Sequence, residues 1–305
     1  MTQKNILSNF TDLLLAELGA RIKGTNTSYG FEIEFLPLNA MDLKQLEELY
    51  QLLPELGFSK EEDHFLSDTG MIITFEPGGQ IEYCSPPLGV DDSELFNKLL
   101  KQIAKINAEI LSRLGIQYLA TGFIPGRGDS PLCLQMERYR KLHQRMPFSG
   151  TRGREMMKGT ASVHLHIALR SLKEMPLIYR TLCRLSHDDE FAMSIERRHI
   201  WNNTDAPRCG MPLIDGNRTL EPGRLIREII HHALCADDLY ENIPVYELKD
   251  LTFDYFLSHL TTIFTDVRLN MKGPTLELRT PDSLPLPDFI GKWKLFTSIF
   301  KKVLK

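Results

Sequence analysis

The stretch ITFEPGGQIEYCSPP, residues 73–87, decides the fold, because it places acidic side chains on a pair of short strands. β-Branched and aromatic residues lead into Glu76, residues 77–79 interrupt the run, and a second alternating run follows. Proline followed by glycine is typical of a type II turn, so the stretch predicts two strands joined by a tight bend. Gln80 and Glu82 are two residues apart and share a face, with Glu76 near them across the bend. Carboxylates this close repel one another unless a positive charge lies between them.

The composition is that of an ordinary soluble globular protein. The chain has 305 residues, 42% hydrophobic and 25% charged, which fits one large domain or two intimate ones. A formal net charge of -4 and a sequence pI near 6.2 favour no nucleic-acid partner. The sequence has no secretory signal and no apolar run long enough to span a bilayer, so we expect no membrane partner. Five scattered cysteines indicate free thiols in a reducing compartment, and we expect a cytoplasmic location.

Strand and helix patterns are interspersed along the whole chain. Outside the opening stretch, alternating segments predict strands at 29–38, 115–126, 159–169 and 275–281. Helical periodicity predicts helices at 5–22, 41–57, 91–115, 136–146, 171–199 with interruptions, 223–237 and 252–264. Gly24 and Gly115 are expected to end the helices that precede them, and aspartate and serine at 91–93 to cap the helix they begin. Without a repeat or flexible linker, these elements predict an α+β fold with one open sheet.

The last fifteen residues, GKWKLFTSIFKKVLK, form a basic amphipathic segment within a terminal helix expected at 286–305. A helix on a membrane surface is one interpretation. We favour a helix that packs on the core, because one short amphipathic helix is weak evidence for a membrane and lysines are favourable near a helix C-terminus. The side chains expected to pack are Trp293, Leu295, Phe296, Ile299 and Phe300.

Four predicted strands each place two polar side chains on one face. The pairs are Glu32 and Glu34, Gln80 and Glu82, His164 and His166, and Glu277 and Arg279. A water-facing side of an antiparallel sheet is the simpler interpretation, but such a face would include lysine and threonine. Carboxylates with a histidine or an amide are ligands for Mg²⁺ or Mn²⁺. Zinc is less favoured, because the cysteines are scattered and no H-x-x-x-H pair is present.

At these strands the sequence resembles the carboxylate–amine ligases of the plant-type glutamate–cysteine ligase family. The resemblance runs through GFEIE, FEPGGQIEYCSPPL, GFIPG, MERYRKL, MMKGTASVHLHI, RRHIWNNTDAPRCG, HLTTIFTDVRL and LELRTPDSLP, in family order. It implies a glutamine-synthetase-like fold, a curved and mainly antiparallel sheet around ATP and its metals, in a single catalytic domain over 1–305. It further implies ATP- and Mg²⁺-dependent joining of glutamate, or a similar amino acid, to an amine such as cysteine through an acyl phosphate, as in glutathione biosynthesis.

The resemblance also implies roles for individual residues. One metal site would consist of Glu32, His164 and Glu277, and another of Glu34, Glu76 and Glu82. Arg279 and Arg198 would act as catalytic residues, Arg279 as a phosphate contact. The residues expected to bind ATP or substrate are Arg198, Trp201, Asp205, Arg208, Gln80 and Arg279. The simpler alternative for Arg198 and Arg208 is a surface ion pair.

Two departures from the family leave alternatives open. The histidines of SVHLHI stand where the cysteine-using plant enzymes tend to carry Gln and Asn, and only a short segment follows Arg279, where members usually continue with a long helical region. The acceptor amine therefore stays open, and so does a homo-oligomer in which a partner completes the site. The alternatives are a non-catalytic nucleotide- or amino-acid-binding relative, acting as a sensor or partner subunit, and a phosphotransferase. Cys84 and Cys209 lie beside the motifs without a base nearby, so we interpret them as buried or incidental thiols.

Overall fold

The computed structural model describes residues 3–24, 26–210, 221–271 and 273–304, and its centre is one open antiparallel sheet. The strands lie in the order β2-β3-β4-β5-β1-β7-β9-β8, with β6 paired to β1. Their bounds are β1 Tyr29–Pro37, β2 Phe58–Lys60, β3 Phe65–Ser67, β4 Ile72–Phe75, β5 Ile81–Cys84, β6 Tyr118–Leu119, β7 Val163–Ala168, β8 Val267–Asn270 and β9 Thr275–Leu278. Every paired strand in the described residues is antiparallel, which confirms the predicted α+β class.

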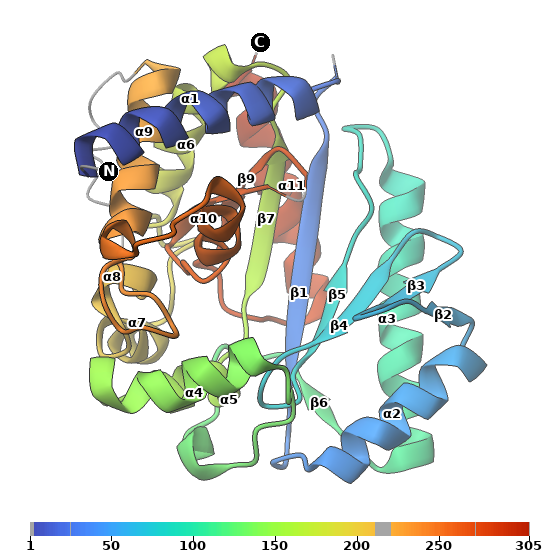
Figure 1. The fold of residues 1–305 in the computed structure, drawn as a ribbon. Helices are drawn as coiled ribbons and strands as arrows, with labels where there is room; N and C mark the ends of the chain where they lie inside the picture. Colours follow the sequence, from blue (N-terminus) through green and yellow to red (C-terminus); the bar gives the residue numbers. More distant parts are fainter. Residues whose placement is uncertain (1–2, 25, 211–220, 272, 305) are drawn as a thin grey trace.

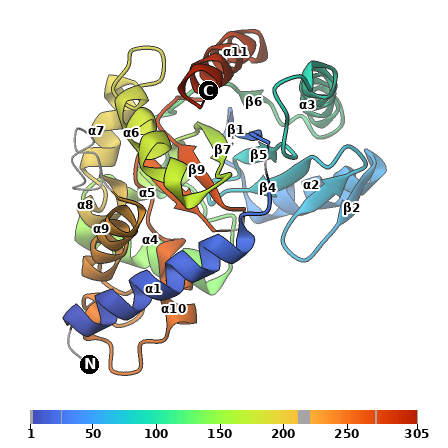
Figure 2. The same cartoon turned by 90° about the horizontal axis from the view of Figure 1, so that it is seen from above.

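Helices lie on both sides of this sheet (Figures 1 and 2). Helices α3 and α11 cover one face and α4 and α10 lie over the opposite side, while α6 packs against β9 and β8, and α1 packs against α9. The bounds are α1 Gln3–Arg21, α2 Leu43–Glu55, α3 Ser93–Leu114, α4 Glu137–Ser149, α5 Gly153–Gly159, α6 Met175–Leu185, α7 Ile195–Asn202, α8 Ala206–Cys209, α9 Pro222–Cys235, α10 Phe253–Leu260 and α11 Leu286–Val303.

The central strand β1 separates an apolar face from a polar one. The ring of Phe31 lies 5.9 Å from that of Phe96 on α3 and 5.6 Å from that of Trp293 on α11, centroid to centroid. Because successive side chains of a strand alternate, Glu32 and Glu34 point to the opposite face. The core therefore lies between the sheet and α3 and α11, and the polar side chains are free to form a site on the other side.

The turn that connects β4 to β5 is not the predicted type II turn. A type II turn requires a positive φ at Gly78, but the positive value, +82°, belongs to Gly79. The Gly79 N–H donates to the Glu76 carbonyl at 2.9 Å, and the Glu76 N–H donates to the Gln80 carbonyl at 2.9 Å. This is a three-residue hairpin loop, a type I turn followed by a left-handed residue. The type II prediction was wrong because the pattern Pro-Gly-Gly fits either turn.

Several element boundaries also differ from the predictions. Asp92 precedes α3, but its side chain accepts a hydrogen bond from the Gly89 N–H at 2.6 Å and makes none to its own helix. Gly115 does end α3 in a left-handed conformation, φ 68°, as predicted. Gly24 does not end α1, because that helix stops at Arg21. The expected strand at 115–126 shrinks to β6, and the short strands β2, β3 and β8 were missed.

The C-terminal helix α11 packs on the core. Trp293, Phe296 and Phe300 are buried as expected, and Phe289 joins them. Leu295 is 38% exposed, so its predicted packing was wrong. In the described part of the chain, no helix is both long and apolar enough to cross a membrane.

Candidate active site

The polar side chains predicted on four strands gather in neighbouring rows across the sheet. The register pairs Glu34 on β1 with Glu82 on β5, and Glu32 on β1 with His164 on β7. The next row pairs His166 on β7 with Glu277 on β9. Residues directly opposite each other in an antiparallel pair share a face, so these rows form one polar surface.

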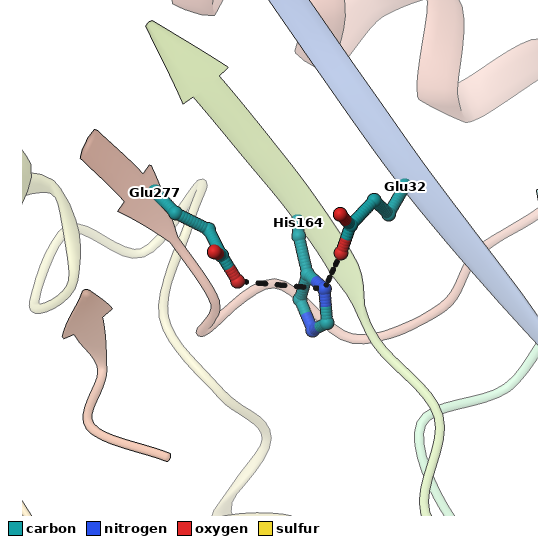
Figure 3. A group of neighbouring side chains, drawn as sticks. All are labelled: Glu32, His164 and Glu277. Carbon is teal, nitrogen blue, oxygen red and sulfur yellow. Dashed lines mark hydrogen bonds and ion pairs between the residues drawn. The ribbon is translucent and has the colours of Figure 1, made fainter. Parts of the chain in front are cut away.

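One group of possible metal ligands matches the first predicted site. Glu32, His164 and Glu277 converge from β1, β7 and β9 (Figure 3). His164 Nδ1 lies 2.6 Å from Glu32 Oε2 and 3.7 Å from Glu277 Oε1. One ligand atom from each of the three lies within 4.8 Å of the others, close enough for all three to bind one ion.

A second group differs from the predicted one by a single member. Glu34, Glu82 and His164 lie within the same 4.8 Å limit. His164 Nε2 is 3.6 Å from Glu34 Oε1, and its Nδ1 is 3.9 Å from Glu82 Oε1. Glu76 lines the same cavity but is not among the members of this group, so its role as a ligand stays a prediction. His164 is thus shared between the two groups.

The carboxylates of the cluster repel one another strongly. Burial, reinforced by Glu32 and Glu76, raises the pKa of Glu82 well above its ordinary value, although Thr74 donates a hydrogen bond to it at 2.7 Å. Burial and the charge of Glu34 raise the pKa of Glu76 to about 7. The electrostatic penalty falls when a divalent cation lies among such groups, because opposite charge favours the ionised form.

Glu277 differs from Glu76 and Glu82, because two arginines hold it ionised. Arg268 Nη2 lies 3.0 Å from Glu277 Oε2, and Arg279 Nη1 donates to Glu277 Oε1. Burial alone would raise the pKa of this carboxyl, but Arg268 and Arg279 outweigh it and lower the pKa to about 2. Sequence reasoning missed Arg268 because it missed β8, although the alternation in VRLN at 267–270 was a signal for that strand.

Four of these side chains, Glu32, Glu34, Glu82 and His164, line a cavity of about 1270 Å³, whereas Glu277 is not among its described lining residues. Arg268 and Arg279 line it from the sheet, and Arg138, Tyr139 and Trp201 line it from the helices opposite. The cavity is at least as large as the sites that usually enclose a drug-sized ligand, so it has room for a nucleotide together with a smaller substrate.

Gln80, predicted to bind substrate or ATP, serves the backbone in this structure. Its Oε1 accepts from the Gly78 N–H at 2.8 Å, and its Nε2 donates to the carbonyls of Met157 and Thr160 at 3.1 Å and 3.0 Å. The amide therefore fastens the hairpin loop to the segment before β7. Binding a ligand through this amide would require these bonds to break, so its binding role stays a prediction.

Trp201 lies on the cavity wall, whereas the predicted ligand Arg198 is paired with a buried carboxylate. Arg198 Nη2 lies 2.8 Å from Asp266 Oδ2, and its Nη1 lies 3.1 Å from Asp266 Oδ1. Arg198 is not among the described residues that line the cavity. A ligand would have to compete with this bidentate pair, so the catalytic role of Arg198 stays a prediction.

Asp205 and Arg208 belong to a buried ion network outside the cavity lining of the described residues. Arg208 Nη1 lies 2.9 Å from Asp205 Oδ2, and Arg145 Nε lies 3.1 Å from the same oxygen. Arg208 is fully buried, so the surface ion pair proposed as the alternative does not describe it. These contacts join α4 to α8, and a hydrogen bond from Arg208 to the Asp237 carbonyl adds the chain that follows α9. The substrate contacts of Asp205 and Arg208 stay predictions.

Arg197 was missed, although it supports the site directly. Its Nη2 donates to the Arg279 carbonyl at 2.9 Å, and its Nη1 lies 2.7 Å from Asp282 Oδ1. It is almost fully buried, so it fixes the chain that leaves β9 and thereby places Arg279. The doubled arginine in RRHIW was the only signal, and it does not tell which arginine points inward.

The two cysteines beside the motifs have different surroundings. Cys209 is buried, and burial raises the pKa of its thiol to about 12, which makes it a poor nucleophile. Cys84 is half-buried and lines the cavity.

The sequence model described as "Glutamate-cysteine ligase family 2(GCS2)" matches residues 28–187, more than half of the chain and most of the polar strands. The chain belongs to this family. The family match ends before β8 and β9, so the placement of Arg268, Glu277 and Arg279 rests on the structure.

The relatives are plant enzymes of greater length. The chloroplastic glutamate–cysteine ligase of Nicotiana tabacum is 29% identical over 303 residues, covering 87% of this chain and 56% of that protein. Chloroplastic glutamate–cysteine ligase of Arabidopsis thaliana is 28% identical over 308 residues, with the same two coverages. The chain thus spans just over half the length of these relatives. A crystal structure described as a novel glutamine synthase homologue aligns with 96% of this chain and 60% of that chain, at 13% identity and a TM-score of 0.35.

Proposed function

We propose that this member of the glutamate–cysteine ligase family 2 is an ATP-dependent carboxylate–amine ligase. It joins glutamate, or a similar amino acid, to an amine such as cysteine. The observation that carries the proposal is the pair of ligand groups that share His164, which lines a large cavity together with Arg268 and Arg279. The plant relatives are glutamate–cysteine ligases, which supports the same reaction.

The residues present fit a divalent metal. Four carboxylates that converge on one imidazole, among them Glu82 with its pKa raised by burial and by neighbouring carboxylates, form a donor set of the kind that holds Mg²⁺ or Mn²⁺. Glu32, His164 and Glu277 would hold one ion, and Glu34, Glu82 and His164 another. Bound there, such ions would neutralise phosphate oxygens and polarise the transferring phosphoryl group.

The chain's own residues position two anions for reaction. The substrate carboxylate must approach the γ-phosphate of ATP, and Arg279 and Arg268 offer planar guanidinium groups that bind phosphate or carboxylate oxygens. A carboxylate oxygen bonds to phosphorus, the bond to ADP breaks, and an acyl phosphate forms. The amine nitrogen then bonds to the acyl carbon and loses a proton, and phosphate leaves.

A cytoplasmic location and a part in glutathione biosynthesis belong to the same proposal. The thiols of the chain are free, as a reducing compartment would keep them. Small molecules are the proposed partners, and a homo-oligomer would offer one way to extend the cavity wall beyond this chain.

The test is an isotope experiment on the full chain. Glutamate labelled with ¹⁸O in its side-chain carboxylate, ATP, Mg²⁺ and a panel of amines should yield ADP, an amide detected by mass spectrometry, and phosphate carrying one ¹⁸O. Label transfer is specific for an acyl phosphate. Retention of ATP without turnover, for every amine in a folded sample, would favour the sensor alternative over the ligase.

A further inference from the structure

We infer that His166 is a further ligand of the first metal group and makes it select a first-row transition-metal dication over Mg²⁺. The inference deepens the proposed function and rests on it for the role of the metal. The proposed reaction gives His166 no role of its own, although the residue lies beside the first ligand group.

His166 is buried and aimed at the first group. It lies two residues after His164 on β7 and is 7% exposed. Its Nε2 is 3.3 Å from Glu32 Oε1, while the other oxygen of the same carboxylate, Oε2, is 2.6 Å from His164 Nδ1. One carboxylate is thus flanked by two imidazoles. Among the described residues, His166 Nε2 has no hydrogen-bond partner.

The other nitrogen of the ring is engaged in a way that suits a ligand. His166 Nδ1 lies 3.2 Å from the hydroxyl oxygen of Thr275 on β9. When Nδ1–H donates to that hydroxyl, the lone pair of Nε2 points toward Glu32. Metal-binding histidines are commonly fixed by such a hydrogen bond on the second nitrogen. The register also places Glu277 directly opposite His166, so the ring lies beside a second ligand of the group.

The chemistry of the donors sets the preference. Glu32, Glu277, His164 and His166 together offer two carboxylates and two imidazoles. Mg²⁺ prefers oxygen ligands and keeps several waters, whereas imidazole nitrogen binds first-row transition-metal ions more strongly. A simple ion pair between a protonated His166 and Glu32 is the competing explanation, and it predicts no nitrogen on the metal from this residue.

Titration calorimetry with each metal ion in the absence of ATP measures the preference for transition-metal ions over Mg²⁺. The full-length protein should bind Mn²⁺ and Co²⁺ at least about tenfold more tightly than Mg²⁺, the scale that a missing or mispositioned ligand costs. His166→Asn should remove most of that difference and leave the Mg²⁺ affinity within about twofold, and Thr275→Val should weaken Mn²⁺ binding in the same direction by less. His231→Gln, at an exposed histidine on α9, is the matched control and should bind as the wild type.

Spectroscopy on the wild type keeps the inference testable if a variant fails to fold. Electron spin echo modulation of protein-bound Mn²⁺ should show two inequivalent imidazole nitrogens, and both ¹⁴N signals should change on ¹⁵N-histidine labelling. One nitrogen, or an Mg²⁺ affinity equal to that for Mn²⁺, would overturn the inference. These measurements need no ATP and no turnover. A protein with two nitrogen couplings but no ligation would lose the proposed function alone, and an Mg²⁺-active ligase with one coupling would lose this inference alone.

Discussion

At the scale of single residues, two carboxylates of one cluster, Glu82 and Glu277, have pKa values shifted in opposite directions. Glu82 is surrounded by other carboxylates, and burial with their charges raises its pKa. Glu277 lies between Arg268 and Arg279, which lower its pKa to about 2 against the effect of burial. The same chemical change, loss of the negative charge, should therefore have opposite effects on stability at the two positions.

We predict that Glu82→Gln stabilises the metal-free protein, whereas Glu277→Gln destabilises it. The first change removes a charge that its neighbours repel, and the amide oxygen still accepts from Thr74. The second leaves two arginines beside a neutral amide in a buried place, which costs on the order of 3–5 kcal/mol. Urea unfolding in EDTA measures both free energies.

Both variants should also lose turnover by orders of magnitude, because each removes a ligand charge from a metal. Steady-state assays with saturating Mg²⁺ check this loss separately from stability. Shifts of the same sign in the two unfolding free energies, or near-normal turnover in both variants, would contradict the electrostatic description of the cluster.

Sequence patterns found the acidic residues and Arg279, but neither Arg268 nor the partner of Arg198. Glu32, Glu34 and Glu82 follow from strand alternation, a local property that the sequence displays directly. The partner of an arginine depends on which strands and loops meet, so Arg198 was assigned to substrate although it pairs with Asp266. Arg268 was missed for the same reason, because its four-residue strand is defined mainly by pairing with β9.

At the scale of elements, the loop of the β4–β5 hairpin requires glycine at two positions, for two different physical reasons. Gly79 has φ +82°, a left-handed conformation that costs other residues energy. At Gly78 the constraint is space, because a Cβ there would lie 2.4 Å from the Lys158 carbonyl oxygen. The loop thus touches the segment that leads into β7, where His164 is located.

We predict that Gly78→Ala destabilises the protein by about 2 kcal/mol or more, because backbone must move to admit the methyl group. Gly19→Ala is the matched control, since a Cβ at that exposed position of α1 meets no described atom within 4 Å. The control should be neutral or stabilising by up to about 1 kcal/mol, because alanine favours helix. Thermal unfolding of both variants measures the contrast, and equal shifts would show that the loop tolerates a side chain.

At the scale of the whole molecule, the wall of the cavity depends on contacts between helices that lie far apart in sequence. Leu257, Leu260 and Thr261, at the end of α10, line the cavity. His259 in the same helix is buried, and its Nε2 lies 3.0 Å from the Ala233 carbonyl on α9. Part of the cavity wall is therefore formed by α10, and the packing of α10 against α9 depends on the neutral form of His259.

We predict that acid weakens this docking through His259. Burial, with the nearby charge of Arg208, lowers the pKa of His259 from 6.5 to about 4. Between these two values the unfolded chain binds a proton that the folded protein does not, so stability from this group is complete above about pH 6.5 and is lost as the pH falls toward 4. Urea unfolding at pH 7.5 and pH 5 should show a smaller loss for His259→Gln than for the wild type, while exposed His231→Gln keeps the wild-type loss. The lost hydrogen bond lowers the stability of His259→Gln at both pH values, so the difference between the two pH values isolates the titration. Equal losses in all three proteins would mean that His259 does not couple α10 to acid.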